Sequence, residues 1–258
     1  MYKEIIVIKV GTNVMTNKDN RIVRPVLTRL VKQIAELYER GIITILVSSG
    51  SVIAGKEVLG DSSIQNKTQK RQVYSAIGQP RLMSLYYKIF KDHGMRCAQV
   101  LPTKRDFSPG IHRENMISCC EGLLSEGVIP IANEDDAVSL TMSMFSDNDE
   151  LASLIAKLIN ADRLIILTDI DGLYTGHPDV ESSNLIHNVT PKEDLEKYIK
   201  DNNNDKKEGE GRGGMGSKLI YAQQTAAHNI PTFIANGKRD NTIIDIIDGK
   251  NIGTKVSL

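Results

Sequence analysis

The sequence lacks the features that define several large classes of protein. Its 32 basic and 32 acidic residues cancel, so no net positive charge favours binding to nucleic acid or to an anionic membrane. No apolar run approaches the ~18 residues that span a bilayer, and the first residues lead into a strand-like segment without a charged-then-apolar leader. We therefore expect a cytoplasmic protein without a nucleic-acid or membrane partner, in which any phosphate binding is local.

Residues that form disulfides or bind metals are also sparse. The three cysteines, Cys97, Cys119 and Cys120, show no Cys-x-x-Cys spacing, and we interpret them as reduced packing residues. The five histidines match neither a zinc pattern nor a catalytic triad, so solvated or packing roles are expected. A chain of 258 residues can bury a full core, which favours one large domain or two intimate lobes.

Apolar runs rich in Val and Ile alternate with longer amphipathic segments, a pattern typical of an α/β fold with a mostly parallel sheet. It predicts strands at residues 5–10, 42–47, 96–101, 128–132, 164–168 and 231–235. It predicts helices at residues 26–38, 69–77, 81–92, 113–125, 151–159, 191–199 and 217–228. The hydrophilic stretch at residues 200–211 is too polar to pack and is interpreted as a mobile flap or linker.

Two lysines beside glycines predict a phosphate site. Lys9 lies in an apolar strand-like segment and is followed by Gly11, and Lys218 ends a glycine-rich turn that precedes a helix. An unpaired ammonium group is costly to bury, so Lys9 needs a partner or a ligand. A glycine turn that opens a helix offers unpaired N–H groups to an anion. We interpret the two lysines as a phosphate clamp, which indicates an ATP-using kinase.

The glycine turn fits neither of the two common nucleotide motifs. Residues 211–216 match G-x-G-x-x-G, but a hydrophilic stretch precedes them where that motif requires a strand. The turn ends in Gly-Ser-Lys, whereas a P-loop ends in Gly-Lys-Ser or Gly-Lys-Thr. Both assignments are rejected, and what they share is kept: backbone amides and a lysine directed at phosphate oxygens. For this segment alone, a flexible turn with a surface lysine is the alternative.

Polar residues follow several of the predicted strands. Ser49 and Gly50 could supply hydroxyl and amide donors to a carboxylate, or form a plain turn that caps the next helix. Carboxylates gather at two further strand-to-loop junctions: Asp135, Asp136, Asp147 and Asp149. Such groups can hold magnesium, bind an ammonium group or orient lysines. The alternative is helix capping, with Asn148 or Asp149 as the cap of the helix at 151–159.

Taken in order, the motifs resemble those of the glutamate 5-kinases within the amino acid kinase family. They are KVGT at 9–12, VSSGS at 47–51, AIGQ at 76–79, NEDDAV at 133–138, DND at 147–149, LTDIDGLY at 167–174 and GGMGSK at 213–218. The resemblance implies an open αβα sandwich with a mostly parallel central sheet, in a single domain. It implies an amino-acid-binding lobe at about 1–160 and a nucleotide-binding lobe at about 161–258.

The activity that the resemblance implies is ATP-dependent phosphorylation of the side-chain carboxylate of L-glutamate, the first step of proline biosynthesis. It implies that Lys9 and Lys218 bracket the transferred phosphoryl group while Asp149 holds both lysines. Glutamate is expected to bind to Ser49, Gly50, Asn133, Asp136 and Asn148. ATP is expected to bind to Lys9, Gly11, Thr168, Asp169, Arg212, Gly213, Gly214, Met215, Gly216, Ser217 and Lys218. Magnesium is expected to bridge the ATP phosphates, proline to act as a feedback inhibitor, and the chain to form a homo-oligomer.

Two departures from the family pattern stand out. The family usually reads Asn-Glu-Asn-Asp where residues 133–136 read Asn-Glu-Asp-Asp, so Asp135 adds a negative charge that is expected to weaken glutamate affinity. Many members also carry a C-terminal PUA domain, for which no length is left here, so a minimal kinase form is expected. The rival interpretations are a kinase of the same fold acting on acetylglutamate, aspartate, carbamate or a nucleoside monophosphate, and a nucleotide sensor without catalysis.

Overall fold

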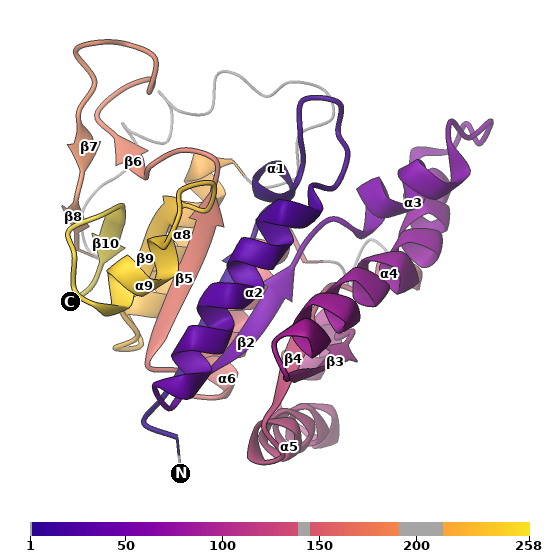
Figure 1. The fold of residues 1–258 in the computed structure, drawn as a ribbon, viewed down its shortest axis with the longest axis horizontal. Coiled ribbons are helices and arrows are strands. Elements are labelled where there is room, and N and C mark those ends of the chain that lie inside the picture. The colour runs from indigo at the N-terminus through magenta and orange to yellow at the C-terminus, as the bar shows by residue number, and fades with distance from the viewer. Residues whose placement is uncertain (1, 139–144, 191–213) are drawn as a thin grey trace.

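The centre of the protein is an eight-stranded sheet with helices on both faces (Figure 1). The structure is a computed structural model that describes residues 2–138, 145–190 and 214–258. The strands in spatial order are β3 (Arg96–Val100), β4 (Val128–Ala132), β2 (Ile42–Ser48), β1 (Glu4–Val10), β5 (Arg163–Thr168), β9 (Thr232–Asn236), β10 (Thr254–Val256) and β8 (Asn188–Val189). A separate hairpin joins β6 (Leu173–Tyr174) to β7 (Leu185–Ile186).

The six predicted strands are all present, each with ends within one residue of the prediction. Neighbouring strands from β3 through to β9 run parallel, and β10 pairs antiparallel to β9. The prediction of a mostly parallel sheet is therefore confirmed. Because both faces are covered, the central strands are apolar along almost their whole length, as buried parallel strands are.

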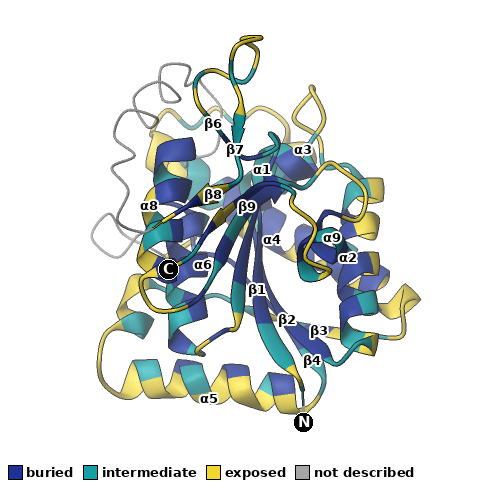
Figure 2. Ribbon diagram, turned by 90° about the vertical axis from the view of Figure 1, so that its left-hand side faces the viewer, coloured by how far each residue is buried: buried dark blue, intermediate teal, exposed yellow. Residues whose placement is uncertain are grey.

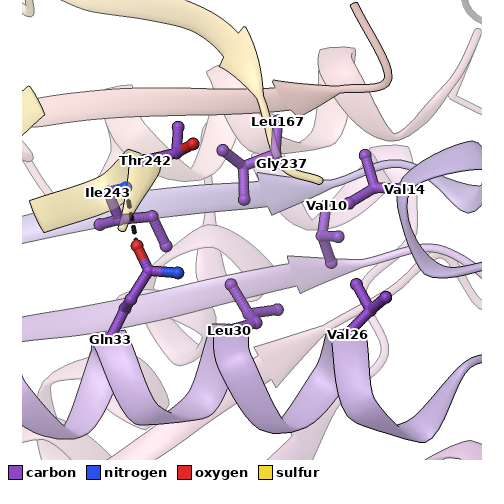
Figure 3. Close-up of a pocket in the computed structure, with 9 residues that line it drawn as sticks. All are labelled: Val10, Val14, Val26, Leu30, Gln33, Leu167, Gly237, Thr242 and Ile243. Atoms are coloured by element: carbon purple, nitrogen blue, oxygen red, sulfur yellow. Dashed lines mark hydrogen bonds between the residues drawn. The ribbon is translucent and has the colours of Figure 1, made fainter. Parts of the chain in front are cut away.

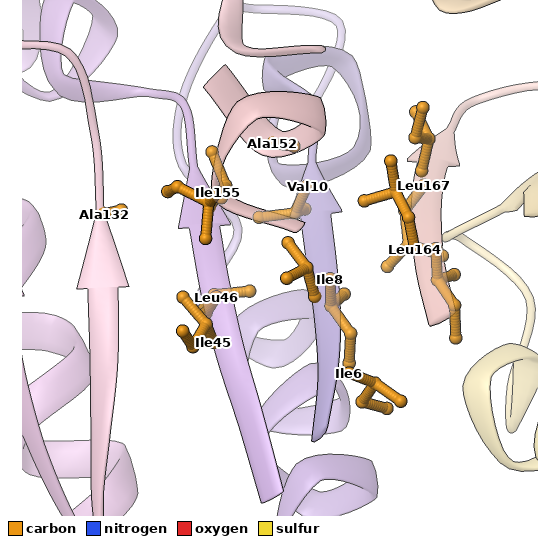
Figure 4. Packing of buried hydrophobic residues seen from close by; sticks show 14 of the residues in the cluster. Ile6, Ile8, Val10, Ile45, Leu46, Ala132, Ala152, Ile155, Leu164 and Leu167 are labelled. Carbon is orange, nitrogen blue, oxygen red and sulfur yellow. The ribbon is translucent and has the colours of Figure 1, made fainter. Parts of the chain in front are cut away.

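The core lies on both sides of β1 (Figure 4). Ile6 and Ile8 of β1 lie between Leu46 of β2 and Leu164 of β5, and all of them are fully buried. Ile155 of helix α6 (Asn148–Leu158) packs against these side chains. This packing fixes the end of β1, where Lys9 is located, with respect to the start of α6.

The helices form two layers (Figure 2). One layer contains α2 (Arg24–Glu39), α4 (Lys67–Asp92) and α9 (Thr242–Ile247), and the other contains α6 and α8 (Met215–Ala226). Helix α5 (Ile111–Ser125) packs against β4, α3 (Ser51–Leu59) packs against α4, and α1 (Thr12–Met15) follows β1. A 3-10 helix spans Lys104–Phe107. The predicted helix at 191–199 and the hydrophilic stretch at 200–211 lie outside the described residues.

Helix α4 contradicts the prediction of two separate helices at 69–77 and 81–92. It is continuous and carries Pro80 in its interior. A proline there removes one backbone hydrogen bond, but both halves of α4 are held by packing, because Tyr74 precedes the proline and Tyr86 and Phe90 follow it, all buried. Tertiary packing therefore overrides the local signal to end the helix.

Helices α3 and α4 cross with their backbones in contact. A Cβ atom at Gly78 of α4 would lie 1.8 Å from the carbonyl oxygen of Ser51, and one at Gly55 of α3 would lie 1.8 Å from that of Tyr74. Any side chain at either glycine would therefore force the helices apart. Helix α3 was not predicted, and its close crossing places one face of α4 beside the ends of β2 and β4.

A small cavity lies between α2, α9 and the sheet (Figure 3). Its lining is mostly apolar: Val10, Val14, Val26, Leu30, Gln33, Leu167, Gly237, Thr242 and Ile243. The side-chain oxygen of Gln33 accepts a hydrogen bond from the backbone N–H of Ile243 at 2.9 Å. Such a lining does not suit a charged phosphate.

Among the described residues, no helix combines the length and apolar character needed to cross a bilayer.

Cys97 and Cys120 are buried, as a packing role requires, whereas Cys119 is exposed, so the packing prediction is wrong for Cys119. Burial raises the pKa of each of the two buried thiols to about 12. These two therefore stay protonated at neutral pH.

Candidate active site

Three charged side chains from distant segments meet beneath the carboxyl ends of the central strands. Lys9 comes from β1, Asp149 from the first turn of α6, and Lys218 from the first turn of α8. The Lys9 Nζ atom lies 2.6 Å from Asp149 Oδ1, and the Lys218 Nζ atom lies 3.2 Å from Asp149 Oδ2. All three side chains are buried. The partner that a buried Lys9 requires is thus Asp149, which also pairs with Lys218.

The charges of this cluster are strongly coupled. Burial lowers the pKa of Lys9, the charge of Asp149 opposes this shift, and the nearby Lys218 adds to it. Burial acts to raise the pKa of Asp149, but the two ammonium groups outweigh it, so the pKa lies below its ordinary value. Asp149 is therefore ionised at neutral pH. With both lysines charged, the cluster is net positive and suits an anionic group.

Asp147 fixes the start of α6. Its Oδ1 atom accepts hydrogen bonds from the backbone N–H groups of Asp149 at 2.8 Å and Glu150 at 3.0 Å. The predicted caps, Asn148 and Asp149, are instead the first residues inside the helix, so that prediction is wrong. The Oδ2 atom of Asp147 accepts a hydrogen bond from the Ser217 hydroxyl in α8. One carboxylate thereby holds the starts of α6 and α8 together.

A cluster of amide and hydroxyl groups lies on the other side of Asp149. The Asn148 amide donates to the Ser49 hydroxyl and to the Asn133 side-chain oxygen, both at 2.9 Å. The Asn133 amide donates to Gln79 Oε1 at 3.0 Å and to Ser51 Oγ at 3.3 Å. Three residues of the predicted amino-acid site are therefore brought together.

Gly50, which follows Ser49, has a φ of 106° and is the N-cap of α3. Within the described structure, no side chain makes a capping hydrogen bond to this end of α3. A Cβ atom at Gly50 would lie 2.7 Å from Met15 Cε, so a larger residue would be both strained and crowded. The alternative of a hydroxyl-capped turn is thus not what forms here. Instead, the Ser49 hydroxyl faces Asn148.

Asp136 is paired with an arginine that the sequence analysis did not identify. The Asp136 Oδ1 atom accepts a hydrogen bond from Arg71 Nε at 2.9 Å and lies 2.8 Å from Arg71 Nη2. The Ser75 hydroxyl donates to Asp136 Oδ2 at 3.4 Å. Asp135 is only half-buried, and its Oδ1 atom accepts a hydrogen bond from the backbone N–H of Ala137 at 3.2 Å.

Several predicted nucleotide residues lie at the ends of β1 and β5 and at the start of α8. The Thr168 hydroxyl donates to Asp169 Oδ1 at 3.2 Å, and the Asn13 amide donates to Asp169 Oδ2 at 3.4 Å. A Cβ atom at Gly11 would lie 3.6 Å from Lys9 Nζ, so this glycine leaves room beside the ammonium group. Gly214 is the N-cap of α8, whose first residues are Met215, Gly216, Ser217 and Lys218. Arg212 and Gly213 lie outside the described residues.

The residues that sequence reasoning missed share one face of α4. Arg71, Ser75 and Gln79 are spaced four apart, which places them on one stripe of a helix, and each contacts a residue of the predicted amino-acid site or its neighbours. Polar residues at this spacing were the sequence signal that could have identified this face of α4.

In the part of the chain that the structure describes, no group of three His, Cys, Asp or Glu side chains is arranged to hold a metal ion.

Comparison with curated proteins gives relatives over almost the whole chain. A glutamate 5-kinase from Bacteroides thetaiotaomicron is 41% identical over 242 residues, which cover 94% of this chain and 66% of that protein. A glutamate 5-kinase from Chlorobaculum tepidum is 39% identical over 251 residues, covering 97% and 68%. The chain thus spans about two thirds of the length of these curated relatives.

Comparison with solved structures shows the fold. An isopentenyl phosphate kinase matches with a TM-score of 0.67 at 19% identity, covering 98% of this chain and all of that one. A carbamate kinase from Giardia lamblia bound to AMP-PNP matches with a TM-score of 0.68 at 18% identity, covering 98% of each. The family model for amino acid kinases matches residues 4–236. With its sheet, its site and these relatives, the chain belongs to the amino acid kinase family.

Proposed function

We propose that the protein is a glutamate 5-kinase, which transfers the γ-phosphoryl group of ATP to the side-chain carboxylate of L-glutamate in the first step of proline biosynthesis. The observation that carries this proposal is the buried Lys9–Asp149–Lys218 cluster beside the amide cluster of Asn133 and Asn148. The names of relatives up to 41% identical point to the same reaction.

The chemistry requires positioning and charge stabilisation more than a covalent partner. The side-chain carboxylate of glutamate is ionised at neutral pH, so it attacks the γ-phosphorus without a general base. The new bond joins a carboxylate oxygen to phosphorus, and the bond from phosphorus to the β,γ-bridging oxygen breaks, which releases ADP. Lys9 and Lys218 neutralise the equatorial oxygens of the phosphoryl group in flight, and Asp149 holds both ammonium groups in place.

The division of the sheet supports two functional halves. We assign glutamate to the side of β3, β4, β2 and β1, at about residues 1–160, with contacts from Ser49, Gly50, Asn133, Asp136 and Asn148. We assign ATP to the side of β5 and β9, at about residues 161–258, with contacts from Thr168, Asp169 and the start of α8. In the strand order, β2 and β4 lie on one side of β1, which carries Lys9, and β5 and β9 lie on the other, which supports this assignment. Inhibition by proline and formation of a homo-oligomer stay predictions.

Magnesium is proposed to enter as part of the nucleotide substrate. Three carboxylates of the proposed site already have partners: Asp149 pairs with two lysines, Asp147 with the start of α6 and Ser217, and Asp169 with Thr168 and Asn13. They do not form a dedicated protein cage, which agrees with the usual binding of magnesium through substrate phosphates and water. The ion would neutralise phosphate charge while the chain positions both substrates.

A coupled assay of ADP release with L-glutamate, L-aspartate and N-acetylglutamate tests the proposal. We expect turnover with glutamate only, together with an acyl phosphate that hydroxylamine converts into a hydroxamate. ADP release that does not depend on an amino acid would contradict it. Preference for aspartate or N-acetylglutamate would assign the protein to another branch of the family.

A further inference from the structure

The ion pair between Arg71 and Asp136 is asymmetric. The Asp136 side chain is 3% exposed, whereas that of Arg71 is 35% exposed. Both short contacts from the guanidinium group reach the same oxygen, Asp136 Oδ1. The other oxygen, Oδ2, receives the Ser75 hydroxyl at 3.4 Å, which is a long hydrogen bond. One oxygen of the buried carboxylate thus accepts strong hydrogen bonds, and the other accepts only a weak one.

The guanidinium group also retains donors that this pair does not use. Arginine carries five N–H donors in a planar fork, and the contacts to Asp136 come from Nε and Nη2. The outer edge of the group is directed away from Asp136, on a side chain that is about one third exposed. A planar fork of this kind matches a carboxylate well.

Contacts along α4 place the pair in the amino-acid site. The Ser75 hydroxyl, one turn along α4 from Arg71, lies within hydrogen-bond distance of both Ser51 Oγ, at 3.1 Å, and Asp136 Oδ2, at 3.4 Å. Gln79, one turn further, accepts from Asn133, which contacts Asn148. The close crossing of α3 and α4 fixes this face of α4 against the ends of β2 and β4. Arg71 therefore belongs to the same bonded network as the residues assigned to glutamate.

An α-amino acid carries an ammonium group and a carboxylate on one carbon atom. The protein surface that complements it places a carboxylate against the substrate ammonium group and a guanidinium group against the substrate carboxylate. With the substrate ammonium on Asp136, which is one of the glutamate contacts assigned above, we propose that the outer edge of Arg71 binds the substrate α-carboxylate. This inference rests on the proposed function and makes Arg71 a specificity-determining residue.

The assignment also gives the extra charge of Asp135 a counterpart. Residues 134–136 carry three acidic side chains in a row, Glu134, Asp135 and Asp136, whose charges repel an anionic amino acid bound at Asp136. A guanidinium group that binds the α-carboxylate offsets that repulsion where the substrate is charged. It also selects for free α-carboxylates, because an amide at that position cannot form the charged pair.

The test compares glutamate with its α-amide, which keeps the ammonium group and the reacting side-chain carboxylate. In the wild type we expect kcat/KM to favour glutamate by about 10- to 150-fold, the range of a charge-assisted contact. Arg71→Gln should bring this ratio close to one, mainly through the KM for glutamate. Arg71→Lys, which keeps the charge without the fork, should give an intermediate ratio. Arg81→Gln, which alters an exposed arginine of the same helix paired with Glu57 at 3.7 Å, should leave the ratio unchanged.

A purely structural role for Arg71 predicts a different result. Loss of a counterion for Asp136 would lower kcat/KM for both substrates alike and leave the ratio as in the wild type, which would overturn the inference while the proposed function stood. A wild type that does not distinguish the two substrates would also overturn it. If Arg71→Gln does not fold, the ratio of Arg71→Lys decides. A wild type without glutamate-dependent ADP release would refute the proposed function itself, and the inference with it.

Discussion

Replacing Asp149 by Asn should leave the buried ammonium group of Lys9 without its ion-pair partner and weaken the hold on Lys218. The substitution keeps the shape of the side chain but removes the charge that lies 2.6 Å from Lys9 Nζ and 3.2 Å from Lys218 Nζ. Removing one partner of a buried ion pair costs about 3–5 kcal/mol, because the remaining charge keeps its desolvation penalty. We expect the free energy of unfolding to fall by about this amount. That is a large part of the ~5–15 kcal/mol of a typical domain, so the variant should fold but unfold at a much lower urea concentration.

Urea unfolding at pH 7, followed by circular dichroism, measures this loss. The matched control is Asp61→Asn, since Asp61 lies 3.5 Å from Lys56 and the two side chains are 94% and 56% exposed. An exposed pair contributes little, so the control midpoint should hardly move. Equal shifts for the two variants, or an unchanged midpoint for Asp149→Asn, would refute the claim that burial makes this carboxylate important.

The pH dependence gives a second test of the same cluster. The pKa of Asp149 is lowered on folding, so its contribution is present above the unfolded value of about 3.9 and is lost as pH falls through the folded pKa. The pKa of Lys9 is also lowered, so the unfolded chain binds more protons and stability from this group rises as pH increases towards about 10.4. Without the charge of Asp149, the pKa of Lys9 is lowered further, so the variant gains more stability than the wild type as pH rises. The difference in free energy of unfolding between wild type and Asp149→Asn should therefore narrow between pH 7 and pH 10. A constant gap would show that the charge of the buried Lys9 is not its cause.

Four further substitutions test the proposed site and the helix crossing beside it. Lys218→Ala should lower turnover by ~10²–10³-fold with little change in the KM for glutamate, and near-normal turnover in steady-state assays would remove Lys218 from the catalytic cluster. Asp136→Asn should raise the KM for glutamate by about 10- to 150-fold and leave that for MgATP unchanged, whereas a raised magnesium requirement with an unchanged glutamate KM would assign Asp136 to the metal. Gly78→Ala should strongly destabilise the protein because of the 1.8 Å contact with the Ser51 carbonyl. Gly122→Ala on α5, where a Cβ would meet nothing within 4 Å, should stabilise it by up to ~1 kcal/mol, and equal effects of the two in thermal unfolding would contradict the close crossing.

The strands could be predicted because buried parallel strands appear as Val- and Ile-rich runs, whichever strands they pair with. The burial of Lys9 could be predicted for the same reason. Its contact with Asp149 could not be derived from spacing, because it depends on α6 and β1 lying side by side although their residues are 140 positions apart. The prediction of two helices at 69–77 and 81–92 was wrong because the packing of α4 against its neighbours, and not the local signal of Pro80, decides where the helix ends. Arg71 was missed because its importance depends on Asp136, which lies on another segment.

The carboxylate of Asp147 links the start of α6 to the start of α8. It caps α6 through one oxygen and binds Ser217 of α8 through the other. A shift of Ser217 would therefore act on the same carboxylate group that holds the first turn of α6, which carries Asn148. If ATP binds at the start of α8, as proposed, its binding would act on the proposed amino-acid half through the Asp147 carboxylate. The affinities for the two substrates should accordingly depend on each other, and each substrate should change the affinity for the other by the same factor.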